Sequence, residues 1–210
     1  MFLEGFKDVP LMGILRGVDE CALLPLSEVV VSSGIKVVEI TMNTPGAGFL
    51  IQKLKKFAKN RFSVGAGTVL NMEQLFAALE AGADFIVMPV VQKDIISHCV
   101  KRRMPVFPGA LTPNEIFSAW KLGATMVKVF PAKRFGPSYF NEVKAPLNDV
   151  RLLACGGITP ENIAEYIRSG ADAAAFGASI FKEEWIEKKQ FALIEQAIKE
   201  LVNAIPRRVG

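Results

Sequence analysis

Lys128 places a charged amine in the middle of residues 125–131, an otherwise apolar run whose composition predicts a β-strand. In a strand, Lys128 shares one face with Met126 and Phe130, so the alternation of side chains does not assign Lys128 to a solvent-exposed face. Burial favours the neutral amine, which is the nucleophile that condenses with a carbonyl group to form a Schiff base. The alternative interpretation is a structural lysine that is paired with a nearby carboxylate.

Glu39 is a second ionisable residue inside an apolar strand-like run, residues 36–41. A structural Lys128–Glu39 pair is one interpretation, but burying both charges costs desolvation, and apolar residues usually serve as well. That interpretation also leaves Arg16 and Thr68 without a role, although they close two further strand-like runs. In the catalytic interpretation, which we favour, Lys128 is the nucleophile and Glu39 moves protons. Arg16 and Thr68 then bind an anionic group such as a carboxylate.

Eight short apolar runs predict the strands that carry these residues, and a helical pattern follows each of them. Glycines close several of the helical patterns, as is common at helix ends. The expected strands are residues 11–16, 36–41, 62–68, 84–90, 105–110, 125–131, 150–156 and 171–177. The expected helices are residues 22–33, 49–58, 72–81, 95–103, 113–122, 139–144, 160–169 and 187–203.

This βα repetition predicts an α/β protein with one domain, a (β/α)8 TIM barrel over residues 1–210. Apolar strands that each precede a helix must pair in parallel and be covered on both faces, which a closed barrel achieves. An open doubly wound sheet is the alternative, but it would need a glycine-rich dinucleotide loop after the first strand, and Arg16-Gly-Val-Asp19 is not one. In a barrel, the polar residues at the C-terminal ends of the strands are expected to form one ring.

Two glycine-containing runs after the seventh and eighth strands predict a phosphate-binding site. Cys155-Gly-Gly-Ile-Thr-Pro-Glu-Asn162 places two glycines just before a Thr-Pro helix start, where backbone amides can converge on an anion. Phe176-Gly-Ala-Ser179 repeats the arrangement one strand later, as in the phosphate site that many barrels form from these two loops. Plain tight turns are the alternative interpretation of both runs.

The composition is that of an ordinary globular protein, with half of the 210 residues hydrophobic and a net charge of +4. The pI near 9.0 suits an anionic substrate, but it equally suits plain solubility. The basic clusters lack the interleaved aromatic residues of a nucleic-acid surface, and no apolar run is long enough to cross a bilayer. Three widely spaced cysteines and a single histidine indicate neither a disulfide framework nor a zinc site. We therefore expect a cytoplasmic protein that binds no metal, nucleic acid or membrane.

A series of motifs along almost the whole chain resembles the aldolase family that cleaves 2-keto-3-deoxy-6-phosphogluconate (KDPG) and 4-hydroxy-2-oxoglutarate (KHG). The resemblance implies a (β/α)8 barrel, usually a homotrimer, that uses no metal or organic cofactor and releases pyruvate and an aldehyde. The motifs are Gly13-Ile-Leu-Arg-Gly17, Val38-Glu-Ile-Thr41, Val64-Gly-Ala-Gly-Thr-Val69, Phe107-Pro-Gly109, Val127-Lys-Val-Phe-Pro131, Phe135-Gly-Pro137 and Gly156-Gly-Ile158.

Carried onto this sequence, the resemblance makes Lys128 the Schiff-base lysine and Glu39 the general acid and base, acting through water. It also implies that Arg16 and Thr68 hold the carboxylate of pyruvate. The remaining implied positions are an apolar pocket wall at Pro89 and Phe130, a substrate contact at Cys155, and a phosphate cradle at Gly156, Gly157, Gly177, Ala178 and Ser179.

Three positions depart from the commonest pattern of the family. Cys155 stands where gluconate-type members tend to have Thr and galactonate-type members an aliphatic residue, so it distinguishes neither sugar epimer. Ala178 stands where a phosphate-binding Ser is frequent, and the adjacent Ser179 would point the other way in a strand. Asn43 falls where some members carry a second carboxylate-binding Arg, a role that Arg16 could fill. Weak selectivity for phosphate is the hypothesis that follows.

The sequence thus predicts a class I aldolase that cleaves KDPG to pyruvate and glyceraldehyde 3-phosphate, with KHG, which yields pyruvate and glyoxylate, as a further substrate. The 2-keto-3-deoxy-6-phosphogalactonate aldolase of the same family is one alternative. A different phosphate-binding barrel enzyme, such as an isomerase or a thiamine-phosphate-synthase-like transferase, would not require Lys128. A non-catalytic anion-binding barrel would not require it either, so trapping of the lysine separates the aldolase from both.

Overall fold

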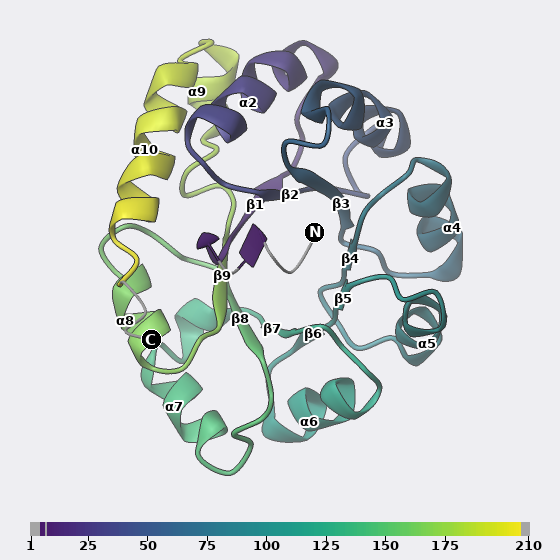
Figure 1. Cartoon of the computed structure of the whole chain (residues 1–210), viewed down its shortest axis with the longest axis vertical. Coiled ribbons are helices and arrows are strands. Elements are labelled where there is room, and N and C mark those ends of the chain that lie inside the picture. The colour runs from purple at the N-terminus through teal and green to yellow at the C-terminus, as the bar shows by residue number, and fades with distance from the viewer. Residues whose placement is uncertain (1–4, 7, 207–210) are drawn as a thin grey trace.

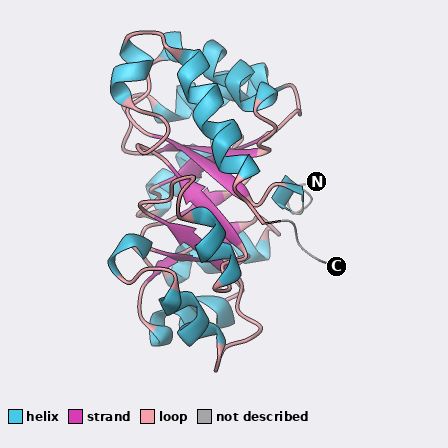
Figure 2. Cartoon of the chain, turned by 90° about the vertical axis from the view of Figure 1, so that its left-hand side faces the viewer, coloured by secondary structure: helices cyan, strands magenta, loops and turns pink. Residues whose placement is uncertain are grey.

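The computed structural model describes residues 5, 6 and 8–206, and it shows nine parallel strands that form a nearly closed barrel with helices on its outside (Figure 1). Along the sheet the strands follow the order β5-β4-β3-β2-β1-β9-β8-β7-β6. Figure 2 shows the strands enclosed between helices. The strands are β1 (Leu11–Leu15), β2 (Val37–Thr41), β3 (Ser63–Gly67), β4 (Ile86–Val87), β5 (Val106–Phe107), β6 (Gly109–Ala110), β7 (Val127–Val129), β8 (Leu152–Cys155) and β9 (Ala173–Phe176).

The single strand expected at residues 105–110 is two short strands, so this part of the prediction is wrong. β5 ends at Phe107 and pairs with β4, whereas β6 begins at Gly109 and pairs with β7. Pro108 lies between them and has no N–H with which to continue a ladder. β5 and β6 are the two ends of the sheet order, and Pro108 alone separates them along the chain. The chain therefore passes from one edge strand of the sheet, β5, to the other, β6, through Pro108.

The helices follow the strands as expected, with two exceptions. The helix expected at residues 187–203 is broken, because Lys189 has a φ of 55° in the left-handed region, which a right-handed helix cannot include. The helix expected at residues 160–169 begins only at Ile163. The helices are α2 (Glu20–Ser32), α3 (Ala47–Ala58), α4 (Met72–Glu80), α5 (Lys93–Lys101), α6 (Pro113–Lys121), the 3-10 helix η1 (Ala132–Arg134), α7 (Ser138–Lys144), α8 (Ile163–Arg168), α9 (Glu183–Glu187) and α10 (Phe191–Asn203).

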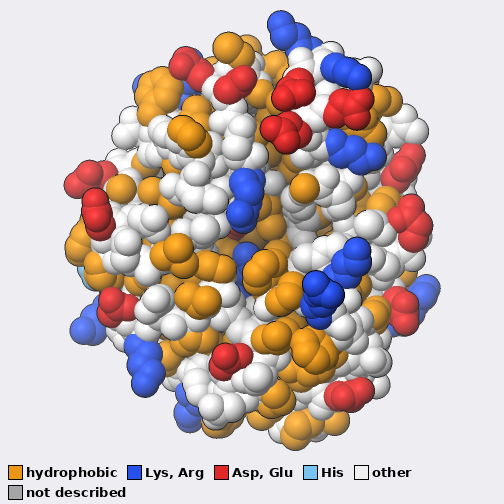
Figure 3. Space-filling model, turned by 180° about the vertical axis from the view of Figure 1, so that it is seen from behind, with side chains coloured by type: hydrophobic (Ala, Val, Ile, Leu, Met, Phe, Trp, Pro, Cys, Tyr) orange, Lys and Arg blue, Asp and Glu red, His pale blue; other side chains and the backbone are white. Residues whose placement is uncertain are grey.

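Apolar side chains form two layers, one between the strands and the helices and one inside the barrel. In β1, Leu11 and Leu15 belong to the outer layer, while Met12 lies in the interior cluster. Phe6 joins the interior cluster, with its ring centroid 6.0 Å from that of Phe107. Figure 1 shows the first described residues, in purple, in front of the barrel, so they cover this end of the interior. The C-terminal ends of the strands lie on the opposite side, which Figure 3 shows from behind.

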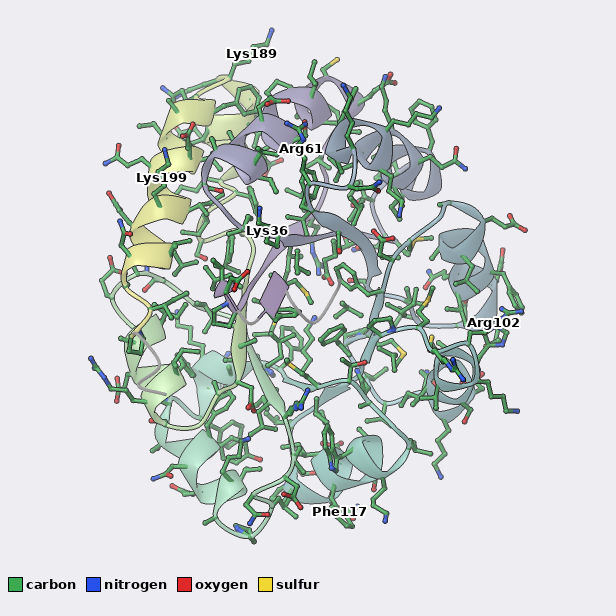
Figure 4. All side chains as sticks on the ribbon, in the orientation of Figure 1. Lys36, Arg61, Arg102, Phe117, Lys189 and Lys199 are labelled. Atoms are coloured by element: carbon green, nitrogen blue, oxygen red, sulfur yellow. The ribbon has the colours of Figure 1, made fainter. Side chains whose placement is uncertain are left out.

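Basic side chains are distributed over the outside of the barrel. Figure 4 places Arg61, Arg102, Lys189 and Lys199 at separate points around it, and Phe117 points outward with 45% of its surface exposed. Within residues 5, 6 and 8–206, no helix combines the length and the apolar character that a membrane span requires.

Candidate active site

Lys128 lies on β7, where it is paired with Gly109 of β6 and Leu153 of β8. Only 6% of the residue is exposed, as expected for a lysine in an apolar strand. Its Nζ lies 5.3 Å from the ring centroid of Phe130, a distance at which a cation and a ring face attract each other. Phe130 is 41% exposed, so it forms an apolar surface beside the amine that a ligand can reach.

Glu39 lies on β2 and is 1% exposed. Neither of its carboxylate oxygens has a hydrogen-bond partner within the part of the chain that the structure describes. Burial raises the pKa of Glu39 above its usual value of 4.5, and the positive charges of Lys128 and Arg16 oppose this shift. A buried carboxyl group with unpaired oxygens is available to a water molecule or to a ligand.

Lys128 and Glu39 form no direct ion pair among those recorded for the described residues. β1, β9 and β8 separate β2 from β7 in the sheet order, and the two side chains approach each other only across the barrel interior. Their charges still influence each other, since the positive charge of Lys128 opposes the rise in the pKa of Glu39.

Gly67 makes room for the Glu39 carboxylate, and the sequence analysis did not identify it. A Cβ on Gly67 would lie 2.3 Å from Oε1 and 2.5 Å from Cδ of Glu39, closer than side-chain atoms normally approach. The two residues lie on neighbouring strands, β3 and β2. The signal was present in the sequence as a glycine inside a strand, which often marks such a close approach.

Arg16 and Thr68 are brought together at the C-terminal ends of β1 and β3. Nη2 of Arg16 donates a hydrogen bond of 3.4 Å to Oγ1 of Thr68. Thr68 has a φ of 56°, which is uncommon for a β-branched residue and directs the chain out of β3 at this point. The two residues are thus in contact, while their binding of a carboxylate stays a prediction.

Thr44 braces the loop that follows Arg16, although the sequence analysis assigned it no role. It is 4% exposed, and its Oγ1 accepts a 3.1 Å hydrogen bond from the N–H of Gly17. The same oxygen lies 3.0 Å from Oγ1 of Thr41 on β2. The sequence could not reveal this, because nothing in the local pattern of residues 42–46 places them beside β1.

Cys155 and Pro89 lie at the same end of the barrel. Cys155 is the last residue of β8 and is 3% exposed. Burial raises the pKa of its thiol, and the neighbouring Lys128 amine opposes this shift. Pro89 follows β4 and is half-buried, and its carbonyl oxygen would lie 2.2 Å from a Cβ on Gly109. Glycine at position 109 thus lets the chain between β5 and β7 pass against Pro89.

The two loops of the expected phosphate cradle lie side by side. Gly156 and Gly157 have φ values of 103° and 78°, which L side chains rarely adopt, so the chain turns sharply after β8. Ser179 does not remain in a strand, because β9 ends at Phe176. Its Oγ donates a 2.8 Å hydrogen bond to the carbonyl of Ile158 and joins the two loops. The expected helix N-terminus at the paired glycines is absent, since α8 starts only after this loop.

A hollow lies at the centre of this face, with basic side chains inside it and on its rim (Figure 3). A cavity of about 630 Å³ adjoins the site between β1 and the β9–α9 loop, and both Arg16 and Ala178 line it, whereas Lys128 and Glu39 do not. No group of three or more His, Cys, Asp or Glu residues that could hold a metal ion occurs in the described ranges. The chemistry that these side chains offer is that of an amine nucleophile with a carboxyl group for proton transfer.

Known proteins match the chain over nearly its whole length. The model of the KDPG and KHG aldolase family matches residues 3–197. The 2-dehydro-3-deoxy-6-phosphogalactonate aldolase of Escherichia coli K12 is 35% identical over 199 residues, which cover 93% of this chain and 97% of that protein. The 2-dehydro-3-deoxy-phosphogluconate aldolase of Treponema pallidum is 30% identical over 204 residues, with 97% and 95% covered.

A solved structure supports the same relationship. KDPG aldolase from Legionella pneumophila, with pyruvate captured as a covalent carbinolamine intermediate, superposes with a TM-score of 0.87 at 26% identity, covering 94% of this chain and 96% of its own. The relatives are aldolases, which break carbon–carbon bonds, so this chain is a carbon–carbon lyase. The resemblance expected from the sequence motifs is confirmed, and the chain belongs to the KDPG and KHG aldolase family.

Proposed function

We propose that this chain is a class I aldolase that cleaves a 2-keto-3-deoxy-6-phospho sugar acid to pyruvate and glyceraldehyde 3-phosphate through a Schiff base at Lys128. The observation that carries the proposal is a buried lysine, Lys128, whose charge acts on the buried and unpaired carboxyl group of Glu39. The Legionella relative supports the same route, since a carbinolamine is the adduct that precedes an imine.

In the proposed mechanism, the amine of Lys128 attacks the C2 ketone, and loss of water gives a protonated imine. The imine accepts the electron pair released when the C3–C4 bond breaks, so pyruvate remains on the lysine as a neutral enamine. The proton of the C4 hydroxyl group passes to Glu39 through water. Protonation of the enamine at C3 and hydrolysis of the imine then release pyruvate. The raised pKa of Glu39 suits a group that must both accept and return a proton.

The remaining site residues orient the substrate in this proposal. Arg16, held by its hydrogen bond to Thr68, binds the carboxylate next to the ketone. Phe130 and Pro89 form the apolar wall, and Cys155 contacts the substrate beside Lys128. The loops at Gly156, Gly157, Gly177, Ala178 and Ser179 hold the phosphate group.

The gluconate epimer, KDPG, is the substrate that the sequence predicts, and the galactonate epimer is the second candidate because the Escherichia coli relative at 35% identity is named for it. KHG is a further candidate, since Ala178 offers phosphate no hydroxyl group. The ratio of kcat/KM for the two epimers decides between the first two, and the ratio for KDPG over KHG measures the need for phosphate.

We further propose that the chain forms one (β/α)8 domain, in which β5 and β6 count as a single interrupted strand. In this proposal the protein is a cytoplasmic homotrimer that uses no cofactor. The relatives are named for small-molecule substrates, which supports a small sugar acid phosphate and pyruvate as the partners of this site. An isomerase, a thiamine-phosphate-synthase-like transferase or a non-catalytic anion-binding barrel is not favoured, because none of them requires Lys128.

Reductive trapping tests the proposal. The protein is incubated with pyruvate and borohydride, and its intact mass is compared among the wild type, Lys128→Ala and the control Lys121→Met, which removes an exposed lysine at the end of α6. Reduction of a pyruvate imine adds about 72 Da. We expect this gain in the wild type and in Lys121→Met but not in Lys128→Ala. A wild type that gains no mass would remove the class I aldolase.

A further inference from the structure

The proposed phosphate cradle lacks a free hydroxyl donor and a cation of its own. Ala178 has no hydroxyl group, and the hydroxyl of Ser179 already donates to Ile158. The carbonyl of Gly157 accepts a 2.8 Å hydrogen bond from Nδ2 of Asn162, which fixes the loop after β8. A phosphate group held here would meet backbone N–H groups, but these two loops place no positive side chain among them.

Lys133 on η1 lies against this cradle at two points. Its backbone N–H donates a 3.1 Å hydrogen bond to the carbonyl of Gly156. Its side chain crosses Gly157, because a Cβ on that glycine would lie 2.9 Å from both Cβ and Cδ of Lys133 and 3.1 Å from Cγ. The absence of a side chain at Gly157 thus gives the aliphatic stem of the lysine a path over the loop.

The amine of Lys133 is available for a ligand. The residue is exposed, and no ion pair is recorded for it within residues 5, 6 and 8–206, whereas Lys144 on the next helix is paired with Asp172. η1 begins three residues after the end of β7, so the strand that carries Lys128 also leads to Lys133 at the phosphate loops. An unpaired ammonium group on a stem that crosses this loop favours a dianion over a neutral group.

We propose that Lys133 is the cationic side-chain ligand of the substrate phosphate and that it determines the preference of this enzyme for phosphorylated substrates. The inference rests on the proposed function, because it assigns a residue to the phosphate end of the same substrate. Lys133 supplies the contact that Ala178 lacks, so phosphate selectivity exceeds what the two loops alone provide. Its contribution is sensitive to salt, since the ammonium group is exposed to solvent.

The test compares Lys133→Met, which keeps the stem over Gly157 but removes the charge, with Lys133→Arg and with the control Arg134→Gln. Arg134 is exposed and lies on the same 3-10 helix, so its loss lowers the net charge equally. Cleavage of KDPG and KHG is measured at two salt concentrations. Binding of glycerol 3-phosphate is measured by calorimetry in the same proteins, which requires no catalysis.

For Lys133→Met we expect KM for KDPG and Kd for glycerol 3-phosphate to rise about tenfold, with KHG cleavage and pyruvate trapping within about twofold of the wild type. Lys133→Arg should restore most of the loss, and Arg134→Gln should show little. The inference would be overturned if Lys133→Met changed the cleavage of KDPG and KHG equally. It would also be overturned if Arg134→Gln affected KDPG cleavage as much as Lys133→Met does, or if Lys133→Met left the Kd for glycerol 3-phosphate unchanged. If the wild type traps no pyruvate but Lys133→Met still weakens glycerol 3-phosphate binding, the proposed function fails and the assignment of Lys133 to a phosphate site stands.

Discussion

Gly67 and the carboxylate of Glu39 are in direct contact between β3 and β2, with the position of a Cβ on Gly67 only 2.3 Å from Oε1 of Glu39. Any larger residue at position 67 must displace the carboxylate or part the two strands. Glu39 has no hydrogen bond to a described residue that would hold it in place, so the shape of its surroundings decides where its oxygens lie. Gly67 therefore controls the position of the proposed acid and base.

Gly67→Ala should reduce kcat by about a hundredfold, since small misplacements of a catalytic group carry penalties of this size. The reaction is followed as pyruvate release from KDPG, and unfolding in urea shows how much stability is lost. Gly65→Ala is the matched control in the same strand, because the atoms nearest to its Cβ would be those of the Phe85 ring, at 2.3 Å, and not those of the Glu39 carboxylate. Equal losses of kcat in the two stable variants would contradict a specific role for Gly67.

Glu39→Gln should change the pH dependence of stability. Burial raises the pKa of Glu39 in the folded protein above 4.5. Between pH 4.5 and this raised pKa, the folded protein therefore binds more protons than the unfolded chain. The free energy of unfolding then falls as the pH rises through this range. Glutamine does not titrate and removes this slope. The free energy of unfolding of the variant relative to the wild type should thus increase from about pH 4.5 upward and level off above the native pKa. Urea unfolding across this range measures it, and a difference that is constant with pH would exclude the raised pKa.

The hydrophobic periods of the sequence predicted most of the strands and helices that position the candidate site. The apolar runs around Glu39 and Lys128 indicated that both lie in buried strands, and strand counting placed Arg16 and Thr68 at one end of the barrel. These inferences succeeded because a parallel sheet with covered faces leaves few arrangements for the strands. The interruption at Pro108 was not foreseen, since the sequence shows the missing N–H but not which neighbour each half of the run pairs with.

Contacts between side chains of distant segments could not be predicted from the sequence. The approach of Gly67 to Glu39 and the path of Lys133 over Gly157 depend on side-chain directions that only the folded chain fixes. The same holds for the separation of Lys128 and Glu39, which the sequence left open between a structural pair and a catalytic one. Lys189 delayed the start of the predicted last helix to Phe191, which the sequence could not indicate because lysine has no intrinsic preference for the left-handed region that it adopts here.

Thr44→Val should weaken the binding of pyruvate. The substitution keeps the volume but removes the acceptor of the Gly17 N–H, at a cost of about 1–3 kcal/mol. Gly17 follows Arg16, so the loop that carries the proposed carboxylate ligand loses its brace. We expect the pyruvate concentration for half-maximal trapping to rise about fivefold. Ser27→Ala, which removes a buried hydroxyl within α2, should leave it unchanged, and an unchanged value in Thr44→Val would reject the bracing role.

The three thiols should react at very different rates with a water-soluble disulfide reagent. Cys21 is exposed at the start of α2, whereas Cys99 and Cys155 are buried. Burial raises the pKa of Cys99 to about 11 and also raises that of Cys155, so neither forms the reactive thiolate readily near neutral pH. We expect one thiol to react quickly in the native protein and the other two only after denaturation. Cys21→Ser should remove the fast phase without affecting pyruvate trapping. A fast phase that persists in Cys21→Ser and is blocked by pyruvate would instead place a reactive thiol beside Lys128.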